Sequence, residues 1–135
     1  MKEKHSILVV DDEKNIADTV AWILQAAGYI ARPVYDGSSA LAITREQTPD
    51  LIISDVLMPG INGIELAINA SIACPRCRIL LFSGQAGSAD MLDEARRQGH
   101  EFELLAKPIE PEDLVKKVAD VLASAQQDDT SARAT

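Results

Sequence analysis

Short apolar runs alternate with amphipathic segments along the chain, and this alternation constrains the fold more than any other feature of the sequence. The run Ile7-Leu8-Val9-Val10 is apolar throughout, as expected of a β-strand that is covered on both faces. Comparable runs recur at regular intervals. We therefore predict five strands, at residues 7–10, 29–34, 51–54, 78–82 and 102–106.

The segments between these runs carry apolar residues at helical spacing. Further helices are predicted at residues 38–47, at 88–98 with Ser88 as the cap, and from about Pro111 onward. The face of the first helix, which Gly28 is placed to end, collects Ile16, Val20, Ile23, Leu24 and Ala27. The stripe of the third consists of Ile64, Ala67, Ile68, Ser71 and Ile72. That of the last consists of Leu114, Val115, Val118, Val121 and Leu122.

Five successive strand–helix units predict an α/β fold, in which a parallel sheet is covered by helices on both faces. The length of 135 residues suits one domain, and a hydrophobic share of 47% is enough for its core. We assign residues 1–123 to this domain. Residues 124–135 are polar and aperiodic, and we predict a disordered tail or linker there.

Chemically distinctive residues follow four of the predicted strands. Asp11 and Asp12 end the first strand, Asp55 ends the third, Ser83 the fourth and Lys107 the fifth. Because ligands of such folds bind at the carboxyl ends of the strands, these side chains should gather at one edge. At about 4 Å and an effective dielectric constant near 20, each like-charged pair costs about 4 kcal/mol. Such a cluster needs cations, which Lys107 and a divalent metal, most suitably Mg²⁺, would supply.

A phosphoryl group fits this set of residues. Phosphoryl transfer needs an in-line nucleophile and positive charge around the oxygens, and a carboxylate such as Asp55 can be the nucleophile. The Ser83 hydroxyl can donate a hydrogen bond to a phosphoryl oxygen. Taken singly, each residue has a plainer explanation: Asp11-Asp12 as a helix cap, Asp55 and Ser83 as turn residues. Their succession on four strand ends favours a site.

These residues lie in motifs that resemble the receiver domains of bacterial response regulators. The matching segments are ILVVDDE, LIISDVLMPGINGIEL, ILLFSG and LLAKPIEPEDL, and the likeness extends over residues 6–123. The resemblance implies a doubly wound, flavodoxin-like or CheY-like three-layer sandwich. Its five parallel strands would have the order 2-1-3-4-5.

The resemblance also implies roles for individual residues. Asp55 matches the phosphoacceptor and a metal ligand, Asp12 the direct Mg²⁺ ligand, and Asp11 an assisting one. The Leu57 carbonyl matches a backbone metal ligand. Ser83 matches the switch hydroxyl. Lys107 matches the phosphoryl-binding lysine, and the Lys107-Pro108 bond is expected to be cis.

The partner implied by the resemblance is a histidine kinase or a histidine phosphotransfer protein, and the output protein or domain stays unknown. Homodimers would use the last two helices and strand five. One departure stands out: Leu104 occupies the place where the family usually has Tyr or Phe, and Phe102 is the nearest aromatic substitute. Leu57 and Gln85 flank the path of attacking water, and an apolar Leu57 predicts a long-lived phosphoryl state.

Several other functions are disfavoured. A net charge of −8 argues against direct nucleic-acid binding, and a chain with no apolar stretch long enough for a membrane span is expected to be cytoplasmic. A metal-dependent phosphohydrolase with an aspartyl nucleophile, the main alternative, would need an acid where Leu57 stands. A flavodoxin-like cofactor binder would suffer repulsion from Asp11 and Asp12. Cys74 and Cys77 are either a redox pair or two reduced thiols.

Overall fold

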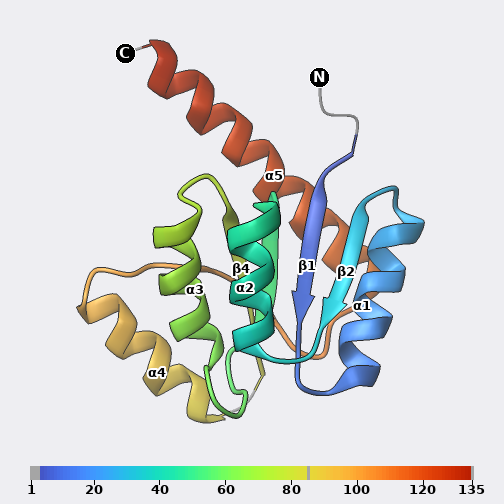
Figure 1. The fold of residues 1–135 in the computed structure, drawn as a ribbon, viewed down its shortest axis with the longest axis vertical. Helices are drawn as coiled ribbons and strands as arrows, with labels where there is room; N and C mark the ends of the chain where they lie inside the picture. The colour runs from blue at the N-terminus through green and yellow to red at the C-terminus, as the bar shows by residue number, and fades with distance from the viewer. Residues whose placement is uncertain (1–3, 85, 135) are drawn as a thin grey trace.

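The computed structural model describes residues 4–84 and 86–134, except for the side chains of residues 86, 87 and 124–134. Strands and helices alternate along the chain (Figure 1). The strands are β1 (Ser6–Val10), β2 (Ile30–Val34), β3 (Leu51–Asp55), β4 (Arg78–Ser83) and β5 (Glu103–Ala106). The helices are α1 (Lys14–Ala26), α2 (Gly37–Gln47), α3 (Gly63–Ala73), α4 (Ala86–Arg97) and α5 (Pro111–Ala134).

All strand pairs are parallel, and the sheet order is β2-β1-β3-β4-β5, which confirms the predicted topology. The register places Asp55 opposite Phe82 and Ser83 opposite Ala106. The arrowheads of β1 and β2 both point to the lower end of the molecule in Figure 1. The residues that follow the strands therefore meet at that edge.

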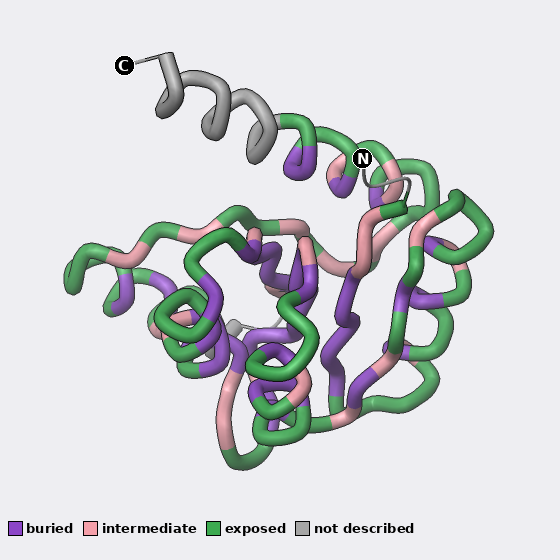
Figure 2. The backbone as a smooth tube through the Cα atoms, turned by 45° about the horizontal axis from the view of Figure 1, so that its top comes forward, coloured by how far each residue is buried: buried purple, intermediate pink, exposed green. Residues whose placement is uncertain are grey.

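Two apolar clusters sandwich the sheet. One joins side chains of β1, β3 and β4 to α2, α3 and α4, and the other joins the opposite face to α1 and α5. Figure 2 shows the central strands as the most continuously buried part of the chain. Residues Leu51 to Asp55 are all buried, so the strand that ends at Asp55 is held from both sides.

The two edge strands differ from the centre. β2 contains Pro33, which an edge strand accepts because it forms ladder hydrogen bonds on one side only. β5 is four residues long and largely exposed. Its Glu103 forms an ion pair with Lys117 of α5, with 2.9 Å between carboxylate oxygen and ammonium nitrogen.

Three helices differ from their predictions. α4 begins at Ala86, so Ser88 lies inside the helix and is not its cap. In α3 the buried face is Gly63, Ile64, Leu66, Ala67 and Ala70, whereas Ser71 and Ile72 are exposed. The predicted stripe shares Ile64 and Ala67 with the buried face but misses Leu66 and Ala70, because large apolar residues lie on more than one side of this helix.

α5 extends beyond the predicted boundary of the domain. Its backbone is helical to Ala134, where a disordered tail was predicted from residue 124. Residues 112–134 contain no glycine or proline, so nothing in the sequence breaks the helix. The side chains of 124–134 lie outside the described part, and the domain boundary at residue 123 stays a prediction.

Helix ends are fixed by local hydrogen bonds. The Asp36 carboxylate caps α2 by accepting from the Ser39 backbone N–H at 2.7 Å. At α3, the Asn62 and Glu65 side chains each accept from the other's backbone N–H, a capping box. Gly28, predicted to end α1, has a φ of +102°, which the left-handed conformation after a helix requires.

The two cysteines lie at the connection between α3 and β4. Both are buried free thiols, and the Cys77 backbone N–H donates to the Cys74 carbonyl at 3.0 Å. Burial and the neighbouring Cys74 thiol raise the pKa of the Cys77 thiol. A raised pKa disfavours the reactive thiolate, which favours two reduced thiols over a redox pair.

Among the described residues, no helix is long and apolar enough to span a bilayer.

Gly63 marks the closest approach between α3 and the end of β3. A Cβ at this position would collide with the Asp55 carbonyl oxygen, and the Gly63 N–H donates to the Val56 carbonyl at 2.9 Å. Only a residue without a side chain can start α3 here. The loop that follows Asp55 is thereby pulled back tightly onto the sheet.

We expect Gly63→Ala to lower the free energy of unfolding by about 1–3 kcal/mol because of this collision, although alanine is intrinsically the better helix former. Chemical denaturation followed by circular dichroism measures the change. Ile72→Ala, at a 76% exposed position of the same helix, is the control. It should alter the free energy by no more than about 0.5 kcal/mol. Equal stability of the two variants would contradict the close approach.

Candidate functional site

Three carboxylates gather at the carboxyl edge of the sheet. Asp11 and Asp12 directly follow β1, and Asp55 is the last residue of β3. One oxygen from each lies within 4.8 Å of the others. Asp11 is fully buried, Asp55 is 4% exposed, and Asp12 is exposed to solvent. The predicted cluster therefore exists, with Asp12 on its open side.

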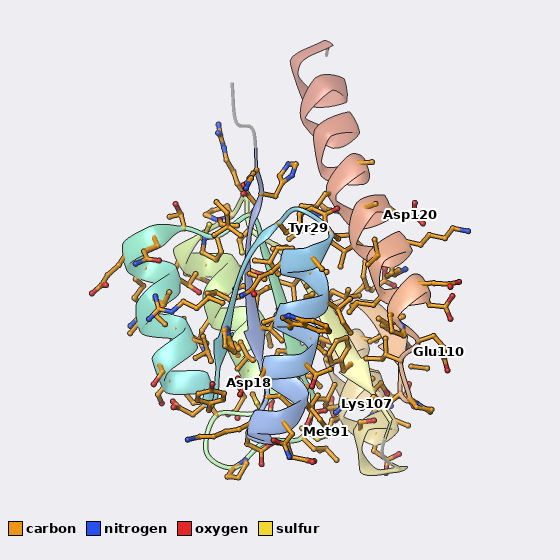
Figure 3. All side chains as sticks on the ribbon, turned by 90° about the vertical axis from the view of Figure 1, so that its right-hand side faces the viewer. Asp18, Tyr29, Met91, Lys107, Glu110 and Asp120 are labelled. Atoms are coloured by element: carbon orange, nitrogen blue, oxygen red, sulfur yellow. The ribbon has the colours of Figure 1, made fainter. Side chains whose placement is uncertain are left out.

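Lys107 provides the positive charge beside this cluster. It directly follows β5, and its ammonium nitrogen lies 3.1 Å from Asp55 Oδ1 and 3.4 Å from Asp11 Oδ2. Figure 3 shows Lys107 in the lower part of the molecule, together with Met91 of α4, while Tyr29, which precedes β2, lies in the upper part. The lysine thus bridges acids from two strands at the edge where the strands end.

The second oxygen of Asp11 accepts a hydrogen bond from the Glu13 backbone N–H at 3.0 Å. Asp11 is therefore held on both sides, by backbone and by Lys107. The plainer explanation of Asp11-Asp12 as a helix cap does not apply, because the N-cap of α1 is Glu13, without a side-chain cap. Asp11 instead stabilises the turn that leads into α1.

Burial and charge act against each other at Asp55. Burial raises the pKa of the Asp55 carboxyl, Lys107 opposes this, and the charges of Asp11 and Asp12 add to the rise. Burial lowers the pKa of Lys107, but the carboxylates of Asp11 and Asp55 together outweigh it and leave that pKa raised. The surroundings thus stabilise the charged form of Lys107 and destabilise the charged form of Asp55.

The cluster fits a divalent metal. Three ionised carboxylates and one ammonium leave a formal charge of −2 (three minus one). The donors are all oxygen atoms, the kind that Mg²⁺ prefers, and the exposed Asp12 gives a hydrated ion access. The Leu57 carbonyl, expected as a further ligand, follows Asp55 by two residues; its role stays a prediction.

Ser83, the last residue of β4, is half-buried. Its hydroxyl oxygen lies 2.9 Å from the hydroxyl oxygen of Ser88 in α4. Its carbonyl accepts from the Lys107 backbone N–H at 3.2 Å, and a Cβ at the next residue, Gly84, would lie 2.6 Å from Lys107 Cβ. The end of β4 and Lys107 are therefore packed directly against each other.

The residues expected to affect switching and the lifetime of the phosphoryl group differ in their burial and contacts. Leu57 is half-buried against the core, and Leu104 of β5 is 38% exposed. Phe102 precedes β5 and stacks on His100, with ring centroids 6.4 Å apart and an interplanar angle of 7°. Gln85 lies outside the described residues. The Lys107-Pro108 bond is cis, as predicted.

The sequence analysis missed two interactions near the site, the contact of Ser88 with Ser83 and the capping box of α3. Ser88 was predicted as a cap, and its hydroxyl instead faces Ser83. The capping box of Asn62 and Glu65 could have been found, since an Asn followed three residues later by Glu is its usual signal. The contact with Ser88 had no such signal, because it depends on where α4 begins.

Comparisons with known sequences identify related proteins. The response regulator receiver domain profile matches residues 7–119. The DNA-binding response regulator MtrA of Mycolicibacterium smegmatis is 30% identical over 117 residues, covering 85% of this chain and 49% of MtrA. The regulatory protein VanRc of Enterococcus gallinarum is 48% identical over 66 residues, covering 49% of this chain and 28% of VanRc. The chain thus spans at most about half the length of these curated relatives.

Solved structures of similar fold include two proteins of 28% or higher identity. The chemotaxis protein CheY4 of Vibrio cholerae has a TM-score of 0.77 at 32% identity, over 87% of this chain and 98% of CheY4. NtrX from Brucella abortus has a TM-score of 0.85 at 28% identity, over 98% of this chain and 30% of NtrX.

The excess negative charge of the cluster leads to a stability prediction. Without divalent cations, Asp55→Asn should raise the free energy of unfolding by on the order of 1 kcal/mol, because it removes one member of a mutually repelling set. Added Mg²⁺ should stabilise the wild type more than the variant, since an ion that binds only the folded state stabilises that state.

Denaturation in a chelator and in Mg²⁺ measures both effects. Asp120→Asn, which removes an exposed carboxylate of α5, should change the free energy by no more than about 0.5 kcal/mol in either condition. A destabilised Asp55→Asn in the chelator would show that repulsion does not dominate the cluster.

Proposed function

The chain belongs to the response regulator receiver domain family, and we propose that Asp55 is the residue through which it accepts the phosphoryl group. Receiver domains are the phosphoacceptors of two-component signalling. The observation that carries the assignment is the position of Asp55. It is a nearly buried carboxylate at the end of the central strand β3, 3.1 Å from Lys107 and within 4.8 Å of two further carboxylates.

The proposed reaction is phosphoryl transfer from a phospho-histidine of a histidine kinase or a histidine phosphotransfer protein. An Asp55 carboxylate oxygen forms a bond to phosphorus while the phosphorus–nitrogen bond breaks, and its electron pair stays on the imidazole. The product is an acyl phosphate on Asp55. Lys107 neutralises charge on the phosphoryl oxygens, and the Ser83 hydroxyl donates a hydrogen bond to one of them.

The metal of the proposed site is Mg²⁺. Asp11, Asp12 and Asp55 would hold it, with the Leu57 carbonyl as a further ligand, and the bound ion would supply positive charge to the phosphoryl oxygens. Asp11 is preorganised for this role, because its hydrogen bond from the Glu13 N–H fixes the carboxylate before any ion arrives.

We propose a signalling switch that catalyses only its own phosphorylation and dephosphorylation. The alternative, an aspartyl-nucleophile phosphohydrolase, would use an acid two residues after the nucleophile to assist the leaving group. Leu57 occupies that position, and its hydrocarbon side chain can neither give nor take a proton.

Output and assembly stay predictions. MtrA is named a DNA-binding regulator, so the expected absence of direct nucleic-acid contact is proposed for the receiver domain alone. A homodimer through α4, β5 and α5 would place the exposed Leu104 and the Glu103–Lys117 ion pair in its interface. The cytoplasmic location expected from the sequence is likewise a prediction.

Phosphorylation by a small donor tests the assignment of Asp55. Incubation with acetyl phosphate and Mg²⁺ should add one phosphoryl group to the wild type, as read by intact mass, and none to Asp55→Asn. Chelation of Mg²⁺ should abolish the reaction. Asp36→Asn is the matched control, because asparagine caps a helix as well as aspartate does and the site is unchanged. An Asp55→Asn protein that is still modified would refute the assignment.

The apolar Leu57 leads to a prediction about lifetime. Leucine cannot orient or activate water beside the acyl phosphate, so phosphorylated wild type should persist well beyond seconds after the donor is removed. Leu57→Asn should shorten the lifetime several-fold, because an amide can hold a water molecule there. Ile72→Asn, at an exposed site on α3, should leave the lifetime unchanged. Loss of phosphate from the wild type within seconds would contradict the prediction.

A further inference from the structure

A pair of hydroxyl groups links the candidate phosphorylation site to α4. Ser83 ends β4, and Ser88 lies in the first turn of α4, with 2.9 Å between the two hydroxyl oxygens. Ser88 is 2% exposed, so the contact is shielded from water on the helix side. Ser83 is half-buried and its backbone touches Lys107, which itself contacts Asp55.

The contact matters to α4 because few of its side chains are buried. Among the described side chains of this helix, the buried ones are Ser88, Leu92 and Ala95, at spacings of four and seven residues along one face. Leu92 and Ala95 pack into the apolar cluster, and Ser88 is the polar member of the face. α4 lies at the periphery of the fold in Figure 1.

A phosphoryl group on Asp55 would compete with Ser88 for Ser83. A hydrogen bond to an ionised acceptor is roughly twice as strong as one between neutral groups, so the Ser83 hydroxyl would turn to the phosphoryl oxygen. A serine hydroxyl changes direction when its side chain moves between staggered rotamers. The contact between the Ser83 and Ser88 hydroxyl groups would then break, which removes one of the interactions that hold α4.

The aromatic side chain that receiver domains usually carry on the fifth strand is missing here, so it cannot couple Ser83 to α4. Leu104 stands where an aromatic residue would rotate, is 38% exposed, and has no polar group to bond with Ser83. Phe102 is stacked on His100 ahead of β5. The hydroxyl pair is a direct side-chain link between the end of β4 and α4.

We propose that Ser88 is a positioning residue of the phosphoacceptor site: its hydroxyl holds Ser83 away from Asp55 in the unphosphorylated protein, and its release on phosphorylation loosens α4. The proposal rests on the proposed function of Asp55 and adds the route by which the site reaches a helix.

Amide hydrogen exchange without phosphodonor tests the contact itself. Four proteins are compared: wild type, Ser88→Ala, Ser83→Ala and the double variant. Each single variant should speed exchange in the first turns of α4 by about 2- to 10-fold, the range expected for one hydrogen bond. The effect of the double variant should be smaller than the sum of the two single effects, because both substitutions remove the same contact. Additive effects, or none, would overturn the proposal.

Phosphorylation by acetyl phosphate and Mg²⁺ supplies the second readout. Ser88→Ala should speed modification about 2- to 10-fold, since Ser83 no longer has to leave a partner. In the Ser83→Ala background the same substitution should change nothing, whereas a role of Ser88 in helix stability alone would act in both backgrounds. Ser71→Ala, which removes a hydroxyl bonded to the Ala67 carbonyl in α3, is the control and should match the wild type.

The two readouts separate the possible failures. A wild type that acetyl phosphate does not modify would refute the proposed function, and the exchange experiment would still decide whether the hydroxyl pair holds α4. A wild type that is modified, with the same Ser88→Ala effect in both Ser83 backgrounds, would refute only the role of Ser88.

Discussion

At one edge of the sheet, three carboxylates lie within 4.8 Å of one another with a single lysine ammonium beside them. Like charges at this distance repel, so the fold must hold them in place by other interactions. The apolar packing on both faces of β1 and β3 does this. The strand ends are then fixed in space, and Lys107 reaches the acids only because β5 lies two strands away from β3 in the same parallel sheet.

Close backbone contacts complete this arrangement. Gly63 lets the loop after β3 fold back against Asp55, and Gly84 lets the chain after β4 pass beside the stem of Lys107. Both glycines are needed for space and not for an unusual backbone conformation. They bring polar backbone and side chains close to Asp55 on a scaffold whose strands leave little freedom at this edge.

Much of this could be predicted from sequence, because the signals are local or follow from topology. Apolar runs marked the strands, and the alternation of strands and helices predicted that Asp11, Asp55 and Lys107 meet at one edge of a parallel sheet. The phase of α3 could not be predicted, since Ile64 and Leu66 face the core while Ile72 is exposed, so large apolar residues lie on more than one side of the helix. Ser88 was misassigned for a related reason: a serine near a helix start reads as a cap, and only the packing of α4 directs its hydroxyl to Ser83.

The edges of the sheet restrict how copies of this domain can meet. Edge strands are the places where two sheets could join by backbone hydrogen bonds, the first step of many aggregates. β2 carries Pro33, which lacks the N–H such a ladder needs, and β5 is short, with its first side chain engaged by Lys117 of α5. Continuation of the sheet from one molecule into the next is therefore disfavoured at both ends. Association between copies of this chain would therefore rely on side-chain surfaces and not on a shared ladder of backbone hydrogen bonds.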